Sequence, residues 1–370
     1  MTMHYLRNLK SITFFGFIFC LIFSGDYYVS DLNVYLFYVV SIFSIYFIRF
    51  EKKENYYAIL VYLFFLLLCV ISSPIKFLED GYYHSFVFSL IAFFCFSIYI
   101  DLFKEPNKDL VIASLLLIFV FFVIVIVNPS QTNRTSFIFG PTILYRVVLF
   151  FYGVSLIYFL KNSKYFSFIF ITGVTFFCIL KIGSRGGIVV MFAMLFSGLF
   201  FFARLKSLIK FIPLIIIPVL FFVDFDYVLS SRAFYFSSES ESSNVRLDKL
   251  SMVYSFMDSK FSEIFFGLEV PSKLVGNYPH NIFAEILFYH GLFAFVLFSL
   301  FYSFTFIVPF LTKDREIKSI FIISLPILIG SQFSGRLLDN YFIMPIVFTI
   351  PIYYIFVSRK NEKIYSNNIV

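Results

Sequence analysis

Side chains able to do chemistry are few in this chain, and the most informative group stands at residues 279–285. His280 and Asn281 precede an apolar helical pattern, and Glu285 follows the histidine at the fifth position. Histidine titrates near neutral pH, so His280 at a helix start is a candidate general base. Its spacing from Glu285 is not that of an ideal same-face pair. A hydrogen-bonded interfacial histidine is the alternative, and His290, further along, is the weaker candidate.

Four arginines form a second group: Arg134, Arg146, Arg185 and Arg246. A guanidinium keeps its charge and binds phosphate through two parallel hydrogen bonds. All four fall on the predicted outer side of the membrane, where positive residues are selected against in short loops. Each alone could reach lipid phosphate by snorkelling. Together they predict a site for a phosphate or pyrophosphate ligand.

Residues 181–187 read Lys-Ile-Gly-Ser-Arg-Gly-Gly and predict a tight turn that opens a helix. Glycine lets backbone approach a ligand closely, and the N–H groups at a helix start favour an anion. An ordinary turn between two helices is the alternative.

The composition of the chain shows what must position these residues. Hydrophobic residues make up 60% and charged residues 14%, whereas soluble domains are about half apolar and a quarter charged. Mean hydropathy is +0.91. Apolar runs of about 17 residues or more recur, each long enough to cross a bilayer. We therefore predict an all-α, polytopic protein with residues 1–370 as a single integral membrane domain.

The apolar runs predict about 12 transmembrane helices. They cover residues 11–24, 32–48, 57–73, 85–100, 110–127, 142–160, 165–181, 187–203, 208–223, 281–310, 319–335 and 340–357. The first is interpreted as an uncleaved span because no small-residue cleavage site follows it.

Most of the 29 Lys and Arg residues fall in alternate loops, which places both termini in the cytoplasm. Residues 224–279 then form one long outer loop between the ninth and tenth spans. Its tip, 230–244, is rich in serine and glutamate, whereas 245–266 has apolar residues near helical spacing. We expect a short amphipathic helix there, lying on the outer surface.

Charged side chains avoid the middle of every predicted span. An ion-coupled transporter binds its substrate near the midplane, so this pattern argues against one and for a site at the outer interface. The four cysteines lie in apolar runs without disulfide or zinc spacing. We expect no metal and no other cofactor. The net charge of +7 is attributed to loops that fix topology, not to nucleic-acid binding.

Four segments, in this order, resemble the O-antigen polymerase and ligase superfamily of bacterial inner membranes. They are RTSFIFGPTILYR at 134–146, GSRGG at 183–187, NVRLDKL at 244–250 and HNIFAEILFYHG at 280–291. The match departs from the family pattern at Thr142, where asparagine is usual. Gly267 fits only loosely the glycine that often follows the loop helix.

The resemblance implies a membrane glycosyltransferase of GT-C architecture that uses glycans carried on undecaprenyl pyrophosphate at the periplasmic face. Arg185 and Arg246 would hold the donor pyrophosphate, and His280 would take the proton from the acceptor hydroxyl. Further substrate contacts are expected from Arg134, Arg146, Asn281 and Glu285, the last supporting its helix end. The family also implies a chain-length regulator as a partner in the same membrane.

Phe139-Gly140-Pro141, between Arg134 and Arg146, favours a polymerase, which extends another lipid-linked repeat unit. A ligase, which transfers finished glycan to lipid A-core, is the first alternative. A flippase for lipid-linked oligosaccharide is the second, although a flippase is expected to have a charged central cavity.

Overall fold

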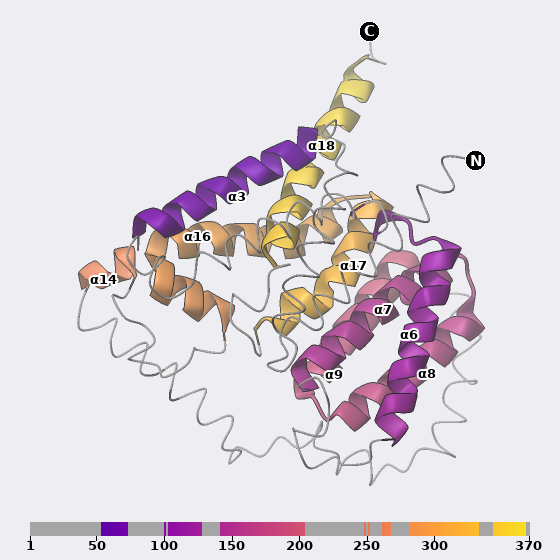
Figure 1. Ribbon diagram of the computed structural model, residues 1–370. Helices are drawn as coiled ribbons and strands as arrows, with labels where there is room; N and C mark the ends of the chain where they lie inside the picture. The colour runs from indigo at the N-terminus through magenta and orange to yellow at the C-terminus, as the bar shows by residue number, and fades with distance from the viewer. Residues whose placement is uncertain are drawn as a thin grey trace, which may run out of the picture. The chain divides into compact units, whose positions relative to one another are not determined.

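The computed structural model describes residues 53–72, 100, 103–127, 141–203, 248, 251, 261–267, 281–332 and 343–367. Regular structure in these ranges is helical and includes no strand, which confirms the all-α prediction. The helices are α3 (Lys53–Ser72), α6 (Lys108–Val127), α7 (Pro141–Lys161), α8 (Tyr165–Ile182), α9 (Arg185–Phe202), α14 (Phe261–Phe266), α16 (Ile282–Leu311), α17 (Arg315–Gly330) and α18 (Ile343–Asn367) (Figure 1).

From 57–73 onward, each predicted span in the described ranges coincides with a helix. The predicted and observed ends differ by a few residues, except at α18, which extends to Asn367. Among the described helices, five are long and apolar enough to cross a membrane: α6, α7, α8, α9 and α16. The chain is therefore a helical protein of membrane-spanning composition. Spans 11–24, 32–48 and 208–223, and 85–100 apart from Ile100, lie outside the described residues. The total of twelve and the GT-C arrangement stay predictions.

Packing divides the chain into two units. In the described part, unit 1 contains α6 to α9 with residues 318–330 of α17. Unit 2 contains α3, α14, α16 and α18 with residues 312–317, Ser331 and Gln332. The chain enters each unit more than once, unlike two soluble domains joined in series.

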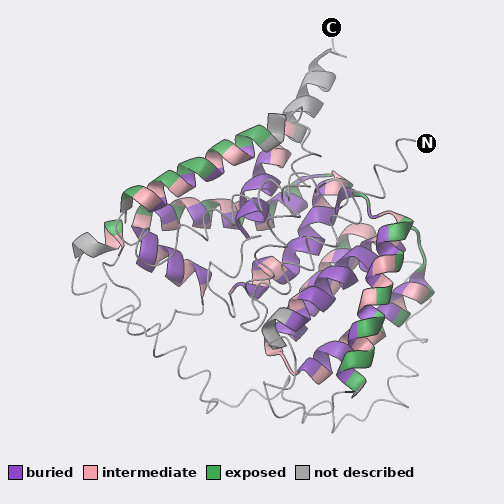
Figure 2. Cartoon of the chain, in the orientation of Figure 1, coloured by how far each residue is buried: buried purple, intermediate pink, exposed green. Residues whose placement is uncertain are grey.

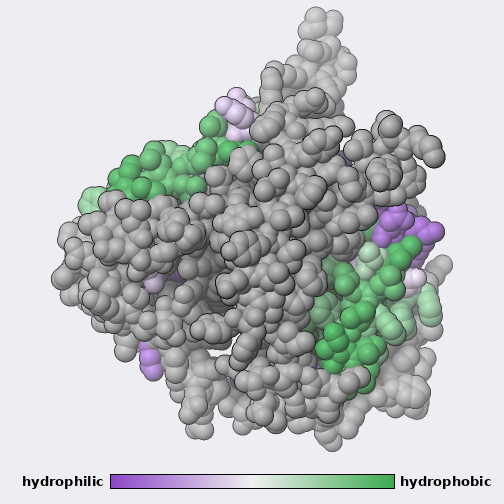
Figure 3. Space-filling model, viewed as in Figure 1, coloured by the Kyte–Doolittle hydropathy of each residue, from purple (hydrophilic) through white to green (hydrophobic). Residues whose placement is uncertain are grey.

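Helix α7 is the centre of unit 1. Its apolar stretch is 83% buried, against 33–44% for the other candidate membrane-spanning helices. Glycines make this packing possible, since a Cβ at Gly153 would lie 2.7 Å from Met194 Cε of α9 and 3.3 Å from Ile323 Cα of α17. The outward face of α6 is instead exposed and apolar, at Leu116 and Phe119 among others, as lipid contact requires (Figures 2 and 3).

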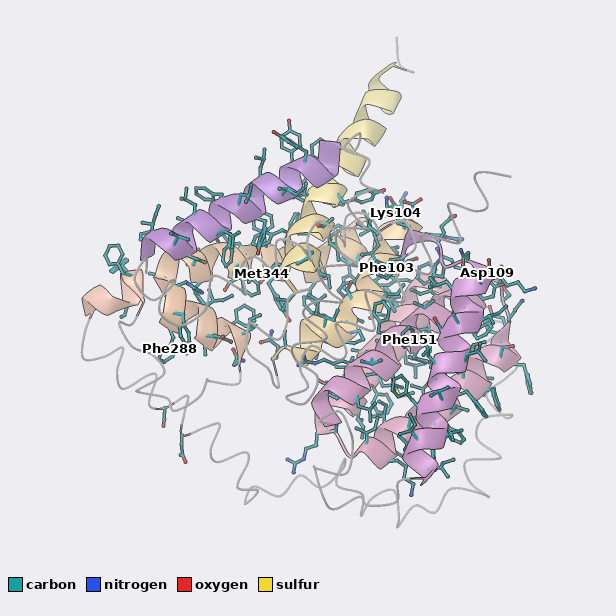
Figure 4. The ribbon with its side chains drawn as sticks, viewed as in Figure 1. Phe103, Lys104, Asp109, Phe151, Phe288 and Met344 are labelled. Carbon is teal, nitrogen blue, oxygen red and sulfur yellow. The ribbon has the colours of Figure 1, made fainter. Side chains whose placement is uncertain are left out.

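One end of unit 1 gathers segments that the sequence assigns to the cytoplasmic side. Lys161 donates a hydrogen bond to the Lys104 carbonyl at 3.1 Å and lies 5.4 Å from the Phe202 ring centroid. Lys318, at the start of α17, lies 5.0 Å from the ring centroid of Phe201. Lys104 and its chain neighbour Phe103 lie at this end of the unit (Figure 4). The shared end is compatible with the predicted alternation of loops, which stays a prediction.

Unit 2 is built on aromatic contacts between α3, α16 and α18. The Phe65 ring of α3 lies 6.3 Å from Phe298 of α16 and 5.5 Å from Phe348 of α18, between ring centroids. Thr305 of α16 donates to the Val347 carbonyl of α18 at 3.1 Å. The other face of α3 is exposed and apolar, with Phe64 53% exposed (Figure 2).

Helix α16 is folded back on itself at Gly291, where the sequence predicts one continuous span over 281–310. Gly291 has φ 75° and ψ −177°, which interrupts the helix between Ile282–His290 and 292–311. The ring centroids of Phe283 and Tyr302 lie 4.9 Å apart, whereas a straight helix would separate these residues by about 28 Å. The two segments therefore pack against each other, with Gly291 at the apex (Figure 1).

Candidate functional site

The turn at 181–187 is a two-residue connection that caps both of its helices. Gly183, in the left-handed conformation at φ 66°, ends α8 and donates to the carbonyls of Ile179 and Leu180. Ser184 begins α9, and its hydroxyl accepts from the Gly187 N–H at 3.4 Å. Capping explains the glycine and the serine, but it gives no reason for an arginine at the next position.

Arg185 is the first residue of α9 and is half-buried. A cation at a helix N-terminus is unfavourable by about 0.3–1 kcal/mol, because the positive end of the helix dipole lies there. A helix N-terminus and a guanidinium both favour an anion. An anionic ligand at this point would offset the local cost of Arg185, which makes it a candidate binding residue.

Tight packing around Tyr145 brings the start of α7, the start of α9 and the end of α17 together. A Cβ at Gly187 would lie 3.2 Å from Tyr145 Cβ, and one at Gly330 would lie 3.0 Å from the Tyr145 hydroxyl. Arg146 follows Tyr145, and Arg185 stands two residues before Gly187. Arg146 and Arg185 therefore share one end of unit 1, opposite the Lys161 end.

Arg146 is also held by the protein. Its Nη2 donates to the Gly330 carbonyl at 2.6 Å, at the C-terminus of α17. A cation there interacts favourably with the helix dipole. Arg146 thus closes the end of a helix, a role that the sequence did not predict, and contact with the substrate stays a prediction.

In unit 2, Asn281 caps the first segment of α16. Its side-chain oxygen accepts from the N–H groups of Phe283 and Ala284 at 3.0 and 3.1 Å. His280, immediately before this cap, lies outside the described residues. The amide oxygen of Asn281 is thus used within the protein, although the sequence analysis expected a substrate contact from this residue.

Gln332 was not predicted from the sequence, but its side chain contacts the cap residue Asn281. Its Oε1 accepts from Asn281 Nδ2 at 3.4 Å, and its Nε2 donates to the hydroxyls of Tyr302 at 3.2 Å and Ser331 at 3.3 Å. The candidate residues were chosen mainly for their charge or their titration near neutral pH, and the side chain of glutamine has neither property. A glutamine directly after Gly330-Ser331 at the end of an apolar span was the available signal.

Glu285 and His290 are both buried in the first segment of α16, at 1% and 4% exposure. The burial of Glu285 fits its predicted support of the helix end, whereas substrate contact stays a prediction. His290 lies at the apex beside Gly291, away from the capped end at Asn281. The rise of this nine-residue segment, about 13 Å, separates the two ends.

The apex of α16 is in backbone contact with the end of α14. Gly267 and Gly291 have φ +77° and +75°. A Cβ at Gly267 would lie 2.6 Å from the Tyr289 carbonyl oxygen, and one at Gly291 would overlap the Phe265 carbonyl. Only glycine fits at either position. The close approach joins the last part of the long loop to the helix that follows His280.

The expected loop helix over 245–266 is described at its end, as α14, and at the helical residues Asp248 and Ser251. The other loop residues, including Arg246, and Arg134 before α7 lie outside the described ranges. Described site residues thus fall into two sets, with Arg146 and Arg185 in unit 1 and Asn281, Glu285 and Gln332 in unit 2. Within those ranges, no cluster of three metal-ligating side chains occurs.

The chain gives no significant match with models of known protein families, with curated proteins or with solved structures. The family resemblance accordingly rests on the four sequence segments. The geometry adds physical reasons for several of their residues: a helix cap at Asn281, close approach at Gly187 and Gly291, and a shared end for Arg146 and Arg185.

Proposed function

We propose that the protein is an O-antigen polymerase of the bacterial inner membrane. It transfers the growing glycan from undecaprenyl pyrophosphate to a sugar hydroxyl of another lipid-linked repeat unit at the periplasmic face. The observation that carries the proposal is the shared end of Arg146 and Arg185 beside the N-terminus of α9. Two guanidinium groups and the positive end of a helix dipole suit a pyrophosphate.

The reaction needs a base and a stabilised leaving group. His280 takes the proton of the acceptor hydroxyl, whose oxygen then attacks the anomeric carbon of the donor glycan. The bond between that carbon and the pyrophosphate oxygen breaks, and undecaprenyl pyrophosphate leaves. Arg185 and Arg246, assisted by Arg134 and Arg146, bind the charge that develops on it. The pyrophosphate is the activating group, so the proposal requires no nucleotide sugar and no cofactor.

The membrane-spanning composition suits this substrate class, because the donor and the acceptor are both lipid-linked. Apolar faces such as those of α3 and α6 would contact acyl chains. A chain-length regulator in the same membrane is the proposed protein partner.

A lipopolysaccharide gel tests the proposal. A deletion strain complemented with wild-type protein should give a ladder, and one complemented with His280→Ala should give core plus one repeat unit. His84→Ala, the same change outside the four motif segments, is the matched control and should keep the ladder. Protein levels are compared by blot.

Other outcomes separate the alternatives. Bare core in the uncomplemented deletion, with accumulated lipid-linked glycan, would identify a ligase. Repeat units stalled on the inner leaflet would identify a flippase. A full ladder with His280→Ala would remove His280 from the mechanism.

A further inference from the structure

We propose that Gln332 is a positioning residue, which clamps the open end of the folded α16 and so fixes the helix start that follows His280. The three residues involved are Asn281, Gln332 and Tyr302. The link between these side chains stands on the structure alone. Its consequence for catalysis rests on the proposed function.

The direction of each hydrogen bond in this chain is determined by the helix cap. Two backbone N–H groups require an acceptor, so the oxygen of Asn281 must face them. Its amide nitrogen then points away from the helix and donates to Oε1 of Gln332. The nitrogen of Gln332 consequently faces the hydroxyls of Tyr302 and Ser331. The Gln332 amide completes this chain in the observed orientation, because its acceptor oxygen and donor nitrogen are both bonded to the same carbon.

Tyr302 is a rigid anchor for the clamp. It is 9% exposed, and its ring centroid lies 5.7 Å from that of Phe298 and 5.2 Å from that of Phe306. Tyr302 belongs to the second segment of α16, whereas Asn281 precedes the first. Gln332 therefore bridges the two segments at the end opposite the Gly291 apex.

The clamp has a clear mechanical consequence. The glycine at the apex has wide conformational freedom, so a second attachment is needed to fix the angle between the segments. The aromatic contact of Phe283 with Tyr302 resists separation, and the hydrogen bonds through Gln332 fix the position of Asn281. A general base must be held within a fraction of an ångström of its working position. Since His280 is bonded to Asn281, loss of the clamp would displace the base.

Hydrogen exchange of the purified full-length protein in detergent tests the clamp without relying on enzyme activity. Gln332→Leu should speed exchange of the Phe283 and Ala284 amides by about threefold to tenfold, the effect of one neutral hydrogen bond. Gln332→Glu keeps the acceptor for Asn281, and the hydroxyls of Tyr302 and Ser331 can turn to donate to it. Its exchange should stay within about twofold of wild type.

Thr305→Val is the matched control, because it removes the buried hydrogen bond to Val347 in the same unit without touching the clamp. It should leave exchange at Phe283 and Ala284 unchanged. If the Gln332→Leu protein does not accumulate in cells, a double-mutant cycle of Gln332→Glu and Asn281→Asp replaces it. The effects of the two changes on the exchange rates should then be non-additive. Wild-type exchange in Gln332→Leu, or equal acceleration in Gln332→Glu, would overturn the clamp.

The polymer ladder then tests the catalytic consequence. Gln332→Leu should lower polymerisation at least about tenfold at equal protein level, and Gln332→Glu should restore most of it. Faster exchange with a wild-type ladder would overturn the positioning role. If deletion of the gene leaves the ladder intact, the proposed function fails, while the exchange comparison still decides whether Gln332 holds Asn281.

Discussion

At the residue scale, a substitution of Arg185 can distinguish the effect of its positive charge from the effect of its planar guanidinium shape. Arg185→Lys keeps the positive charge at the start of α9 but loses the planar fork that binds two phosphate oxygens at once. Losing one charge-assisted hydrogen bond costs about 1.5–3 kcal/mol, so polymerisation should fall roughly tenfold to a hundredfold. The intensity of the lipopolysaccharide ladder at matched protein level measures this fall in polymerisation. Arg315→Lys, an exposed arginine elsewhere, is the control, and unchanged polymerisation with Arg185→Lys would disprove bidentate binding.

Arg146 differs from Arg185 because its guanidinium also holds the end of α17. Arg146→Ala should lower the free energy of unfolding by about 1–2 kcal/mol through loss of this bond, besides its effect on activity. Arg185→Ala removes a cation from a helix N-terminus, which offsets part of the loss of its contacts, so we expect a smaller loss of stability than with Arg146→Ala. Thermal unfolding of the purified variants gives the comparison. Equal stability losses would show that Arg185 is also structural.

At the element scale, the contact of Gly267 with α16 gives the long loop a fixed attachment. Gly291→Ala puts a Cβ into the Phe265 backbone and requires a left-handed alanine, so we expect a loss of at least about 2 kcal/mol. Gly173→Ala in α8 is the control, because a Cβ there meets nothing within 4 Å. Differential thermal unfolding measures both changes. Equal behaviour of the two variants would contradict the close approach at the apex.

These elements also show what the sequence could predict. The ends of α8 and α9 follow from local rules, since Gly183 is a typical C-cap and Ser184 a typical N-cap. The fold-back of α16 has no such rule, because both of its segments are apolar and helical. Gly291 signals a possible bend, but what requires glycine there is contact with residues 265–267, far away in the sequence. Non-local packing of this kind is not encoded in periodicity.

The same distinction holds for the site. Charge and position made Arg146 and Arg185 candidates, because arginines on the predicted outer side break a statistical rule. Gln332 breaks no such rule, and its role depends on hydrogen bonds to residues 30 and 51 positions away. Sequence patterns thus find the groups that could touch a ligand more readily than the groups that hold them.

At the scale of the whole molecule, the fold-back of α16 is compatible with the predicted topology. The second segment, 292–311, rises about 30 Å and is long enough to cross a bilayer alone. The first segment, Ile282–His290, packs antiparallel against it and need not cross the bilayer, so the count of crossings does not change. Both termini keep their predicted cytoplasmic position, and α14 keeps its place in the outer loop.

This topology predicts opposite accessibility for the two ends of unit 1. Lys181→Cys, near the arginine end, should react with a membrane-impermeant maleimide applied to spheroplasts, whereas Lys164→Cys should react only after permeabilisation. The native cysteines are first replaced, and complementation confirms that each variant is active. Alternating loops require this result, because α8 joins the two positions and is long enough to cross the membrane. Labelling of Lys164→Cys in intact spheroplasts would reverse the orientation. It would place Arg146 and Arg185 on the cytoplasmic side, where a polymerase acting at the periplasmic face could not use them.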